Sequence, residues 1–365
     1  MHIHDLLRLL VSRDASDLHV RVGEPPILRI HGHLTRTDLP RLTVEDAENL
    51  LYPMLNEERR HRLETELELD MSYAIRGLAR FRVNMFRQRG DLGAAMRCIP
   101  INIKTIDDIG LPQVSKQLCM LPRGLILVTG PTGCGKSTTL AAMIDYINEH
   151  RQCHIITVED PLEFLHQDKK CAIEQRELAE DTHSFAEALR HVMRQAPDVI
   201  LVGEMRDLET IALAITAAET GHLVFATLHT TDAPQTVDRV IDVFPPDQQN
   251  QIRMQFSVTL ASVISQVLLP RKEEVGRIAA FEVMVVTPGI RALIREGKTH
   301  FLYTDIQTGG QHGMQTLDQH LLQLVHQGKV AYEEALAKTS NPRDFETRAA
   351  RQGLVSLPGV SAAAR

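Results

Sequence analysis

The residue types best suited to chemistry in this chain occupy residues 130–137, where the sequence reads GPTGCGKS. Glycines at three of these positions let successive backbone N–H groups approach an anion without a side chain in the way. Lys136 adds a point charge for the β and γ phosphates of a nucleotide, and Ser137 offers a hydroxyl to Mg²⁺. Every fixed position of the pattern G-x-x-x-x-G-K-S/T is filled, which predicts a phosphate-binding loop.

The flanking sequence supplies the two elements that such a loop requires. Residues 125–129 form an apolar run that predicts a strand, and residues 137–148 predict a helix. The helix would present the positive end of its dipole to the bound anion. We therefore expect a nucleoside triphosphate and Mg²⁺ as ligands. The residues expected to bind them are Gly130, Pro131, Thr132, Gly133, Cys134, Gly135, Lys136, Ser137 and Thr138.

Three carboxylates stand at the end of the next predicted strand, residues 154–158. They are Glu159, Asp160 and Glu163. In α/β sheets, ligands bind beyond the carboxyl ends of the strands. Carboxylate oxygens suit Mg²⁺ or its bound waters. We therefore expect Glu163 to support the metal, directly or through water.

Glu204 follows another predicted strand, residues 199–202, after a single glycine. An acid that surfaces at the end of a buried strand is the natural candidate to polarise the water that attacks a phosphate. Phosphate-loop enzymes usually carry Asp where Gly203 stands, so metal contact would pass to the first group of carboxylates or to water. An acid at a strand end is often only a helix cap. A phosphate loop without a water-positioning acid would be a poor hydrolase, however, which favours catalysis.

His222 and His229 flank a further predicted strand, residues 223–227. A histidine is more often a hydrogen-bonded structural residue than a catalyst, so structural and chemical roles both remain open for these two. Metal ligation is not expected, because no third ligand sits at a recognisable spacing.

The order of the predicted elements divides the chain into four parts. Helical spacing of leucines followed by alternating stretches predicts a mixed α+β domain over residues 1–100. An irregular pattern marks a linker over residues 101–112. Alternating apolar strands and helices then predict an α/β domain with a mostly parallel sheet and a C-terminal helical part over residues 113–340. Residues 341–365 are expected to be a disordered tail.

Composition limits the classes of function. The chain has 365 residues, of which 43% are hydrophobic and 24% charged, and its net charge is −7. An acidic chain with only 4% aromatic residues lacks the features typical of nucleic-acid binders, so no nucleic-acid partner is expected. The cysteines never form a C-x-x-C pair, which indicates reduced thiols rather than a zinc site. No apolar run approaches the ~20 residues of a membrane helix, so contact with a membrane would be peripheral.

Arginine is frequent between residues 76 and 97, where Arg82 and Arg97 lie on alternating stretches. Charges on such stretches usually form a solvated face of a sheet. The alternative is that some of them reach phosphate oxygens at an interface, as an arginine finger does during phosphoryl transfer. From the residues alone, the solvated face is favoured.

Taken together, these motifs resemble those of one family, the secretion ATPases that drive type IV pili and type II secretion. The resembling stretches are the Walker A loop (130–137), the aspartate box (156–164), the Walker B motif with a glycine before its glutamate (198–207) and the histidine box (220–233). Residues 15–19 and 31–34 of the first domain are also similar to that family. The likeness covers most of the chain.

Within that family the chain resembles the pilus retraction, or twitching motility, branch. The sequence shows neither the long N-terminal extension nor the paired-cysteine zinc insertion of the assembly ATPases. Residues 289–298, GIRALIREGK, resemble a C-terminal motif of retraction motors, with Gly289 in place of its first alanine. Residues 313–318 are also typical of that branch.

The resemblance implies a homohexamer that binds ATP between subunits, each with a PAS-like first domain and a RecA-like ATPase domain. It matches Arg82 and Arg97 to the family's phosphate-sensing arginines. It gives His222 and His229 the role of coupling the γ-phosphate state to domain movement. Hydrolysis would return pilin subunits to the membrane through an inner-membrane platform protein, which the motor would contact from the cytoplasmic face at the pilus base.

Three other functions remain open at this point. An assembly or secretion ATPase of the same family would push in the opposite direction. A nucleic-acid motor would respond to DNA, but the basic channel that it needs is not visible in the sequence. The third is a non-hydrolysing nucleotide switch or an interaction scaffold. In that case the wild-type protein and its Glu204→Gln variant would hydrolyse ATP equally slowly.

Overall fold

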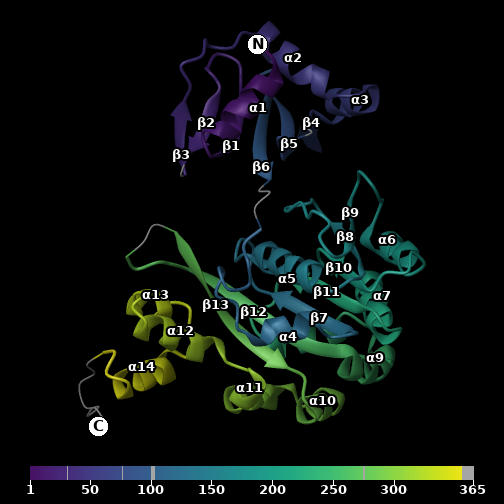
Figure 1. Ribbon diagram of the computed structural model, residues 1–365, viewed down its shortest axis with the longest axis vertical. Helices are drawn as coiled ribbons and strands as arrows, with labels where there is room; N and C mark the ends of the chain where they lie inside the picture. Colours follow the sequence, from purple (N-terminus) through teal and green to yellow (C-terminus); the bar gives the residue numbers. More distant parts are fainter. Residues whose placement is uncertain (31, 76, 100–102, 274–275, 356–365) are drawn as a thin grey trace. The chain divides into compact units, whose positions relative to one another are not determined.

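The computed structural model describes residues 1–30, 32–75, 77–99, 103–273 and 276–355, which form two units (Figure 1). One unit comprises Met1–Asn102 with Glu163–Leu165, and the other comprises Ile103–Leu162 with His166–Arg365. Of the linker expected over residues 101–112, residues 101 and 102 lie outside the described part. The remaining linker residues run through turns into α4 (Val114–Cys119).

The first unit is built on a six-stranded sheet in the order β3-β2-β1-β6-β5-β4, with antiparallel neighbours throughout. Its strands are β1 (Ala15–Val20), β2 (Ile27–Ile30), β3 (His33–Arg36), β4 (Glu68–Ile75), β5 (Ala79–Gln88) and β6 (Asp91–Ile99). Its helices are α1 (Ile3–Ser12), α2 (Val44–Leu51) and α3 (Glu57–Glu66). The three helices and one face of the sheet share a single apolar core. The expected mixed α+β unit is confirmed.

The second unit contains a seven-stranded sheet in the order β13-β12-β7-β11-β10-β8-β9. All neighbours are parallel except the β12–β13 pair, which is antiparallel. The strands are β7 (Gly124–Thr129), β8 (His154–Glu159), β9 (Ala172–Glu177), β10 (Val199–Val202), β11 (Leu223–Leu228), β12 (Leu260–Pro270) and β13 (Arg277–Val285). This arrangement confirms the mostly parallel α/β sheet that the sequence predicted.

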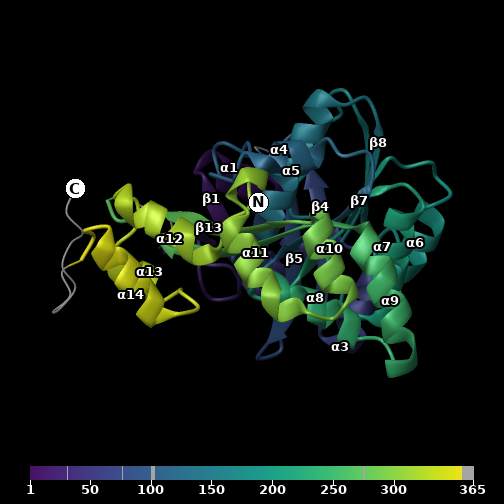
Figure 2. The same ribbon diagram turned by 90° about the horizontal axis from the view of Figure 1, so that it is seen from below.

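Helices cover both faces of this sheet, so its central strands are buried on both sides. Figure 2 shows α4 and α5 on one side and α8 and α10 on the other, and each side has its own apolar core. The helices beyond α4 are α5 (Lys136–His150), α6 (Phe185–Val192), α7 (Leu208–Glu219), α8 (Ala233–Asp242), α9 (Pro246–Thr259), α10 (Pro288–Arg295) and α11 (Leu302–Thr308). Burial on both faces explains why the central strands read as continuous apolar runs.

The chain ends in a small helical group with a core of its own, which corrects one prediction. The group consists of α12 (Leu317–His326), α13 (Tyr332–Leu336) and α14 (Pro342–Arg351). The expectation of disorder over residues 341–365 is wrong for its first part, because Phe345 and Ala349 are fully buried along one side of α14. Residues 356–365 lie outside the described part.

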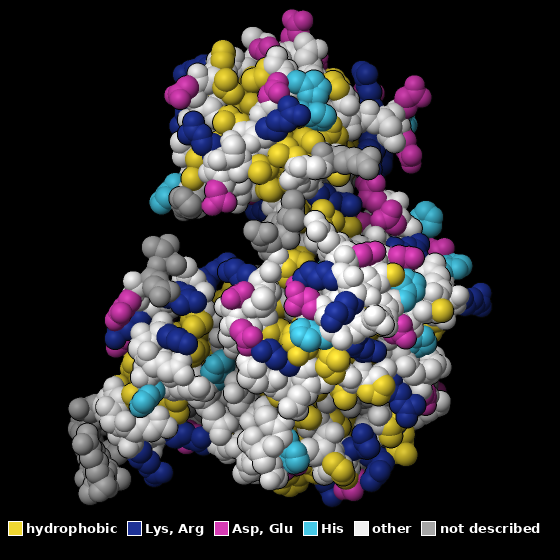
Figure 3. Space-filling model, in the orientation of Figure 1, with side chains coloured by type: hydrophobic (Ala, Val, Ile, Leu, Met, Phe, Trp, Pro, Cys, Tyr) yellow, Lys and Arg dark blue, Asp and Glu magenta, His cyan; other side chains and the backbone are white. Residues whose placement is uncertain are grey.

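The visible surface of the second unit mixes charges of both signs. Lys and Arg side chains are interspersed with Asp and Glu side chains on the face shown in Figure 3. No single-sign patch dominates that face. No helix in the described part of the chain is long and apolar enough to cross a membrane.

Candidate nucleotide site

The phosphate loop connects β7 to α5, so it lies at the carboxyl edge of the sheet. β7 is fully buried between β11 and β12. Gly130 leaves the strand with a φ of +139°, and a Cβ there would overlap the carbonyl oxygen of Gln266. Glycine alone tolerates both constraints, which explains the first glycine of the motif.

Gln266 of β12 braces the loop from the neighbouring strand. Its Nε2 donates to the carbonyl oxygen of Cys134 at 2.7 Å, and its Oε1 accepts from the Thr139 hydroxyl at 2.8 Å. Because Cys134 lies in the loop and Thr139 in the first turn of α5, one buried amide holds both. Sequence reasoning missed Gln266. A glutamine inside an apolar run is the signal that could have found it.

Replacing Gln266 with Leu is expected to weaken ATP binding about tenfold, because unpaired buried polar groups cost about 1–3 kcal/mol and the loop would lose its brace. Isothermal titration calorimetry measures the change. Gln255→Leu is the matched control, since Gln255 bonds to the exposed Glu219 at the end of α7. Equal ATP affinity in wild type and Gln266→Leu would contradict the bracing role.

Lys136 places its ammonium group over the loop. Its Nζ donates to the carbonyl oxygens of Gly130 at 2.8 Å and Pro131 at 3.3 Å. An ammonium group has three N–H donors, so these two bonds leave capacity for a phosphate oxygen. Cys134 adds no charge to the site, because burial raises the pKa of its thiol.

Glu204 lies just beyond β10, at the same edge of the sheet as the loop. Its Oε1 lies 2.9 Å from Nε2 of His229, and its Oε2 lies 2.7 Å from Nη2 of Arg206. The hydrogen bond from Arg206 is the main cause that lowers the pKa of Glu204, and it outweighs the effect of partial burial. Glu204 is therefore ionised at neutral pH and able to orient a water molecule and accept its proton.

The packing of the neighbouring strand explains the glycine before Glu204. The backbone N–H of Gly203 donates to the carbonyl oxygen of Val158 at 2.7 Å. A Cβ at position 203 would lie 3.2 Å from that oxygen and 3.2 Å from Cα of Glu159. The backbone of β8 thus crowds the place where other phosphate-loop enzymes carry an aspartate side chain.

The carboxylates expected near the metal are spread along the sheet edge. Glu159 accepts from the Thr157 hydroxyl at 2.7 Å, at the end of β8. β8 is the third strand from β7, which corresponds to roughly 14 Å at the usual strand spacing. Glu163 is exposed and lies in the short segment that groups with the first unit. Its contact with the metal stays a prediction.

The residues at the loop itself suit Mg²⁺. In residues 1–355, apart from the gaps given above, no group of three or more His, Cys, Asp or Glu side chains is arranged to hold a metal ion. Mg²⁺ is commonly held by one or two protein oxygens together with substrate phosphates and waters. The hydroxyl of Ser137, in the first turn of α5, supplies an oxygen of this kind.

The two candidate histidines lie at opposite ends of β11. His229 follows the strand and contacts Glu204, whereas His222 precedes it. Nδ1 of His222 lies 2.9 Å from the carbonyl oxygen of Ala217, and the His222 carbonyl oxygen accepts from the N–H of Gly124 at the start of β7. The structure therefore brings His229 to the loop edge of the sheet and places His222 at the other edge.

The two candidate arginines are neighbours in the first unit. Arg82 of β5 and Arg97 of β6 are register partners, and both are exposed. Nε of Arg97 donates to Oδ1 of Asp17 at 2.8 Å. Burial would raise the pKa of Asp17, but hydrogen bonds from Ser16 and Arg97 outweigh it and the pKa lies below its usual value. Asp17, Arg82 and Arg97 line a hollow of about 210 Å³.

A second hollow, of about 320 Å³, adjoins the phosphate loop. Its lining joins Gly135 and Thr138 of the loop region to Leu268, Arg277 and Ile278 of β12 and β13. The sequence alone identified no pocket for a nucleoside. This one forms only when the antiparallel β12–β13 pair folds beside the loop, so no local pattern reveals it.

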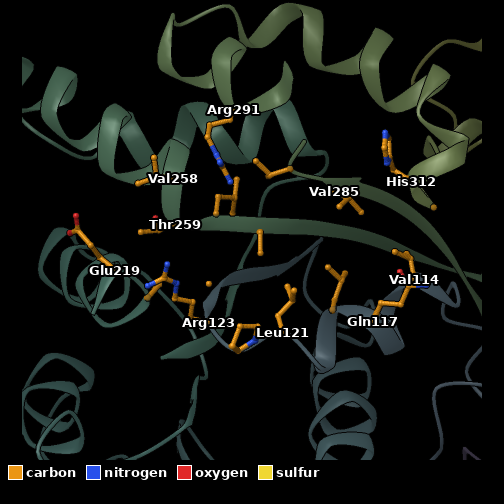
Figure 4. A pocket seen from close by; sticks show the side chains of 18 of the residues that line it. Val114, Gln117, Leu121, Arg123, Glu219, Val258, Thr259, Val285, Arg291 and His312 are labelled. Atoms are coloured by element: carbon orange, nitrogen blue, oxygen red, sulfur yellow. The ribbon is translucent and has the colours of Figure 1, made fainter. Parts of the chain in front are cut away.

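A larger hollow, of about 940 Å³, lies at the opposite edge of the sheet, by the first residues of β7 and β12 (Figure 4). Arg291 of α10 points into it, and Arg123 also lines it. Nε of Arg291 donates to the carbonyl oxygen of Ser257 at 3.1 Å. Residues 289–295 of the stretch that resembles the retraction motif lie in α10, whose Ile290 and Ile294 are buried while Arg291 lines this hollow.

Comparison with known proteins relates most of the chain to one family. A family model described as "Type II/IV secretion system protein" matches residues 2–337. The chain is 51% identical over 345 residues to the "Type IV pilus retractation ATPase PilT" of Pseudomonas aeruginosa, with 94% of this chain and 100% of the relative covered. It is 48% identical over 316 residues to a "Twitching motility protein" of Neisseria gonorrhoeae, with 87% of this chain and 84% of the relative covered.

A solved structure, "Crystal Structure of the Pilus Retraction Motor PilT and Bound ADP", resembles the chain with a TM-score of 0.89 and 46% identity. The likeness covers 95% of this chain and 99% of that one. Both the first unit and the second unit are therefore included in the match. The second structural relative, the ATPase DotB of Legionella pneumophila, has a TM-score of 0.74 at 26% identity.

Proposed function

The chain belongs to the Type II/IV secretion system protein family and is a P-loop ATPase, and from this premise we propose that it powers the retraction of type IV pili. The observation that carries the proposal is the end-to-end likeness to a pilus retraction ATPase, which includes both units. The phosphate loop and the ionised Glu204 supply the chemistry that such a motor needs.

The residues of the second unit divide the work of hydrolysis. Backbone N–H groups of residues 132–137 and the ammonium group of Lys136 hold the β and γ phosphates. Bound Mg²⁺, held by the Ser137 hydroxyl, would neutralise charge on those phosphates. The Glu204 carboxylate orients the attacking water, and His229 shares that carboxylate at 2.9 Å. His229 is thus placed to sense whether Glu204 is engaged.

We further propose that the hollow of about 320 Å³ beside the loop receives the nucleoside of ATP. Its position next to Gly135 and Thr138 puts it within reach of a nucleotide whose phosphates lie on the loop. Apolar Leu268 and Ile278 would contact the flat base, and polar groups at the rim would contact the ribose.

The working form is proposed to be a homohexamer that acts on an inner-membrane platform protein from the cytoplasmic side, at the pilus base. The arginines matched to phosphate sensing, Arg82 and Arg97, are carried by the first unit, whereas the phosphate loop is in the second. A ring in which a first unit approaches the loop of another subunit would complete the site. Glu163 is proposed to support Mg²⁺ through water in that assembly.

Cells that lack this gene are expected to carry many long pili that fail to shorten. Live imaging of labelled pili measures the rate and frequency of shortening. A strain with Glu204→Gln should match the deletion, because a motor that binds ATP without hydrolysing it produces no cycle. The Gln255→Leu strain is the control and should retract as wild type does. Bald cells would instead assign the protein to pilus assembly, the main alternative within the family.

A further inference from the structure

A buried glutamate outside the phosphate loop joins the first residues of two helices. Glu282 of β13 is 3% exposed. Its Oε1 accepts from the backbone N–H of Ala233, the first residue of α8, at 2.8 Å. The backbone N–H of Leu317, the first residue of α12, also bonds to this carboxyl group. The N-terminus of a helix carries partial positive charge, so the carboxylate lies between two favourable ends.

We propose that Glu282 is a positioning residue for the pair formed by Glu204 and His229. The segment from 229 to 233 has a polar contact at each of its ends. At one end His229 contacts Glu204 at 2.9 Å, and at the other the N–H of Ala233 is held by Glu282. Between them, the Thr230 hydroxyl lies 2.6 Å from the Thr236 hydroxyl of α8. Release of the Ala233 end would therefore loosen the histidine that shares the water-orienting carboxylate.

Glu282 lies in the same cross-strand row as Thr129, the residue that precedes the phosphate loop. Its register partner on β12 is Ser265, and side chains of register partners share one face. The Ser265 hydroxyl accepts from the hydroxyl of Thr129, the last residue of β7 before the loop, at 2.8 Å. One row of polar side chains thus runs from the loop strand through β12 to the glutamate that anchors α8.

The ionisation of Glu282 is set by its surroundings. Burial is the main cause that raises its pKa, to about 7, and the N–H groups of Ala233 and Leu317 act against that rise. The charged groups that face it are Asp232 before α8 and Asp318 of α12, and both raise the pKa further. On α12, burial lowers the pKa of His320 to about 4, so that ring is neutral near pH 7.

Two consequences separate a positioning role from a structural one. The ionised carboxylate offers acceptors to both helix ends, whereas the neutral acid carries a proton on one oxygen, so positioning should improve as pH rises through about 7. The contribution of Glu282 to folding stability changes with pH in the opposite direction. Because the folded pKa exceeds the ordinary value of 4.5, this group's contribution to stability is present below about pH 4.5 and is lost as pH rises through about 7.

The test is Glu282→Gln in the full-length ATPase, with kcat and KM for ATP measured from pH 6 to 9. The glutamine side chain has one acceptor oxygen, which can accept from only one of the two helix ends. Its NH₂ group would face the backbone N–H of the other helix, and two donors cannot form a hydrogen bond. We expect kcat at pH 8 to fall about tenfold with KM changed less than about threefold. The wild-type rise in kcat near pH 7 should flatten in the variant. Thermal unfolding at pH 8 should show a Tm equal to or above that of wild type.

Asp318→Asn is the matched control. Asp318 is also buried at the start of α12, but its Oδ1 accepts from the Thr339 hydroxyl and the Ser340 N–H, away from α8. Its kcat at pH 8 should stay within about twofold of wild type, and the loss of its charge should move the rise in kcat to lower pH without flattening it. If Glu282→Gln leaves kcat and its pH profile unchanged, or if both variants lower kcat alike, the positioning role is overturned.

Ala233→Pro gives a second route that does not alter the glutamate. Proline is favoured at the first position of a helix and has no N–H, so the change removes the donor that Glu282 holds. Its loss of kcat should match that of Glu282→Gln, and the double variant should lose no more than either single variant. Additive losses would mean that the two residues act separately, which would overturn the proposal. These tests measure only ATP hydrolysis, so their outcome does not depend on whether the protein drives pilus retraction.

Discussion

Glu204→Gln is expected to lower kcat for ATP about 100- to 1,000-fold while leaving ATP affinity within about threefold of wild type. The amide keeps the size of the carboxylate, so the contact to His229 and the shape of the site persist. It carries no negative charge and cannot accept the proton of the attacking water. Steady-state hydrolysis and calorimetric titration with ATP measure the two effects separately.

Glu209→Gln is the matched control for that change. Glu209 lies in the first turn of α7, soon after Glu204, and its exposed side chain pairs with Arg190 at the surface. Its kcat should equal that of wild type. If wild type and Glu204→Gln hydrolyse ATP equally slowly, the chain is a nucleotide switch and not a motor.

Arg97→Ala is expected to keep ATP binding and to lower kcat about 1,000-fold or more, because an arginine finger contributes roughly 10³- to 10⁵-fold to kcat. Nε of Arg97 bonds to Asp17, and a guanidinium has five N–H donors in all, so the same residue has capacity for a phosphate. Asp17 would then set the direction of the side chain. Hydrolysis and ATP titration again measure the effect.

Arg62→Ala is the control for Arg97→Ala, because Arg62 is an exposed arginine of the same unit that pairs along α3 with Glu66. Mixing subunits gives a sharper test. Inactive Arg97→Ala subunits mixed with inactive Lys136→Ala subunits should regain activity if the arginine serves the loop of another subunit. Activity that stays at the level of the separate variants would restrict Arg97 to its own chain. Full activity of Arg97→Ala alone would mean that Arg97 only forms part of a solvated sheet face and does not contact phosphate.

The parts of the site that depend on local sequence were predicted. The phosphate loop needs glycines, a lysine and a serine at fixed spacing, and a buried strand followed by an acid indicates Glu204. Gln266 and Glu282 were missed because the residues to which they are hydrogen-bonded are distant in sequence. Gln266 lies in β12 and Glu282 in β13. Their hydrogen bonds reach Cys134 and Ala233, and no pattern along the chain relates those positions.

The strands of the second unit also differ in whether local sequence predicts them. β7, β8, β10 and β11 were predicted because burial on both faces makes them continuously apolar. β9, β12 and β13 were not, since β9 is a polar edge strand and β12 is an apolar run that also suits a buried helix. His222 and His229 are close in sequence, yet an extended strand between them sends them to opposite edges of the sheet.

The large hollow at the amino edge of the sheet has a pharmacological consequence. Phosphate loops are shared by many unrelated enzymes, so a compound that competes with ATP meets the same backbone cradle in all of them. The hollow of about 940 Å³ is formed by side chains such as Arg123, Arg291 and His312, which belong to no general nucleotide motif. A small molecule seated there would leave the ATP site open, so ATP would not compete with it for the same site.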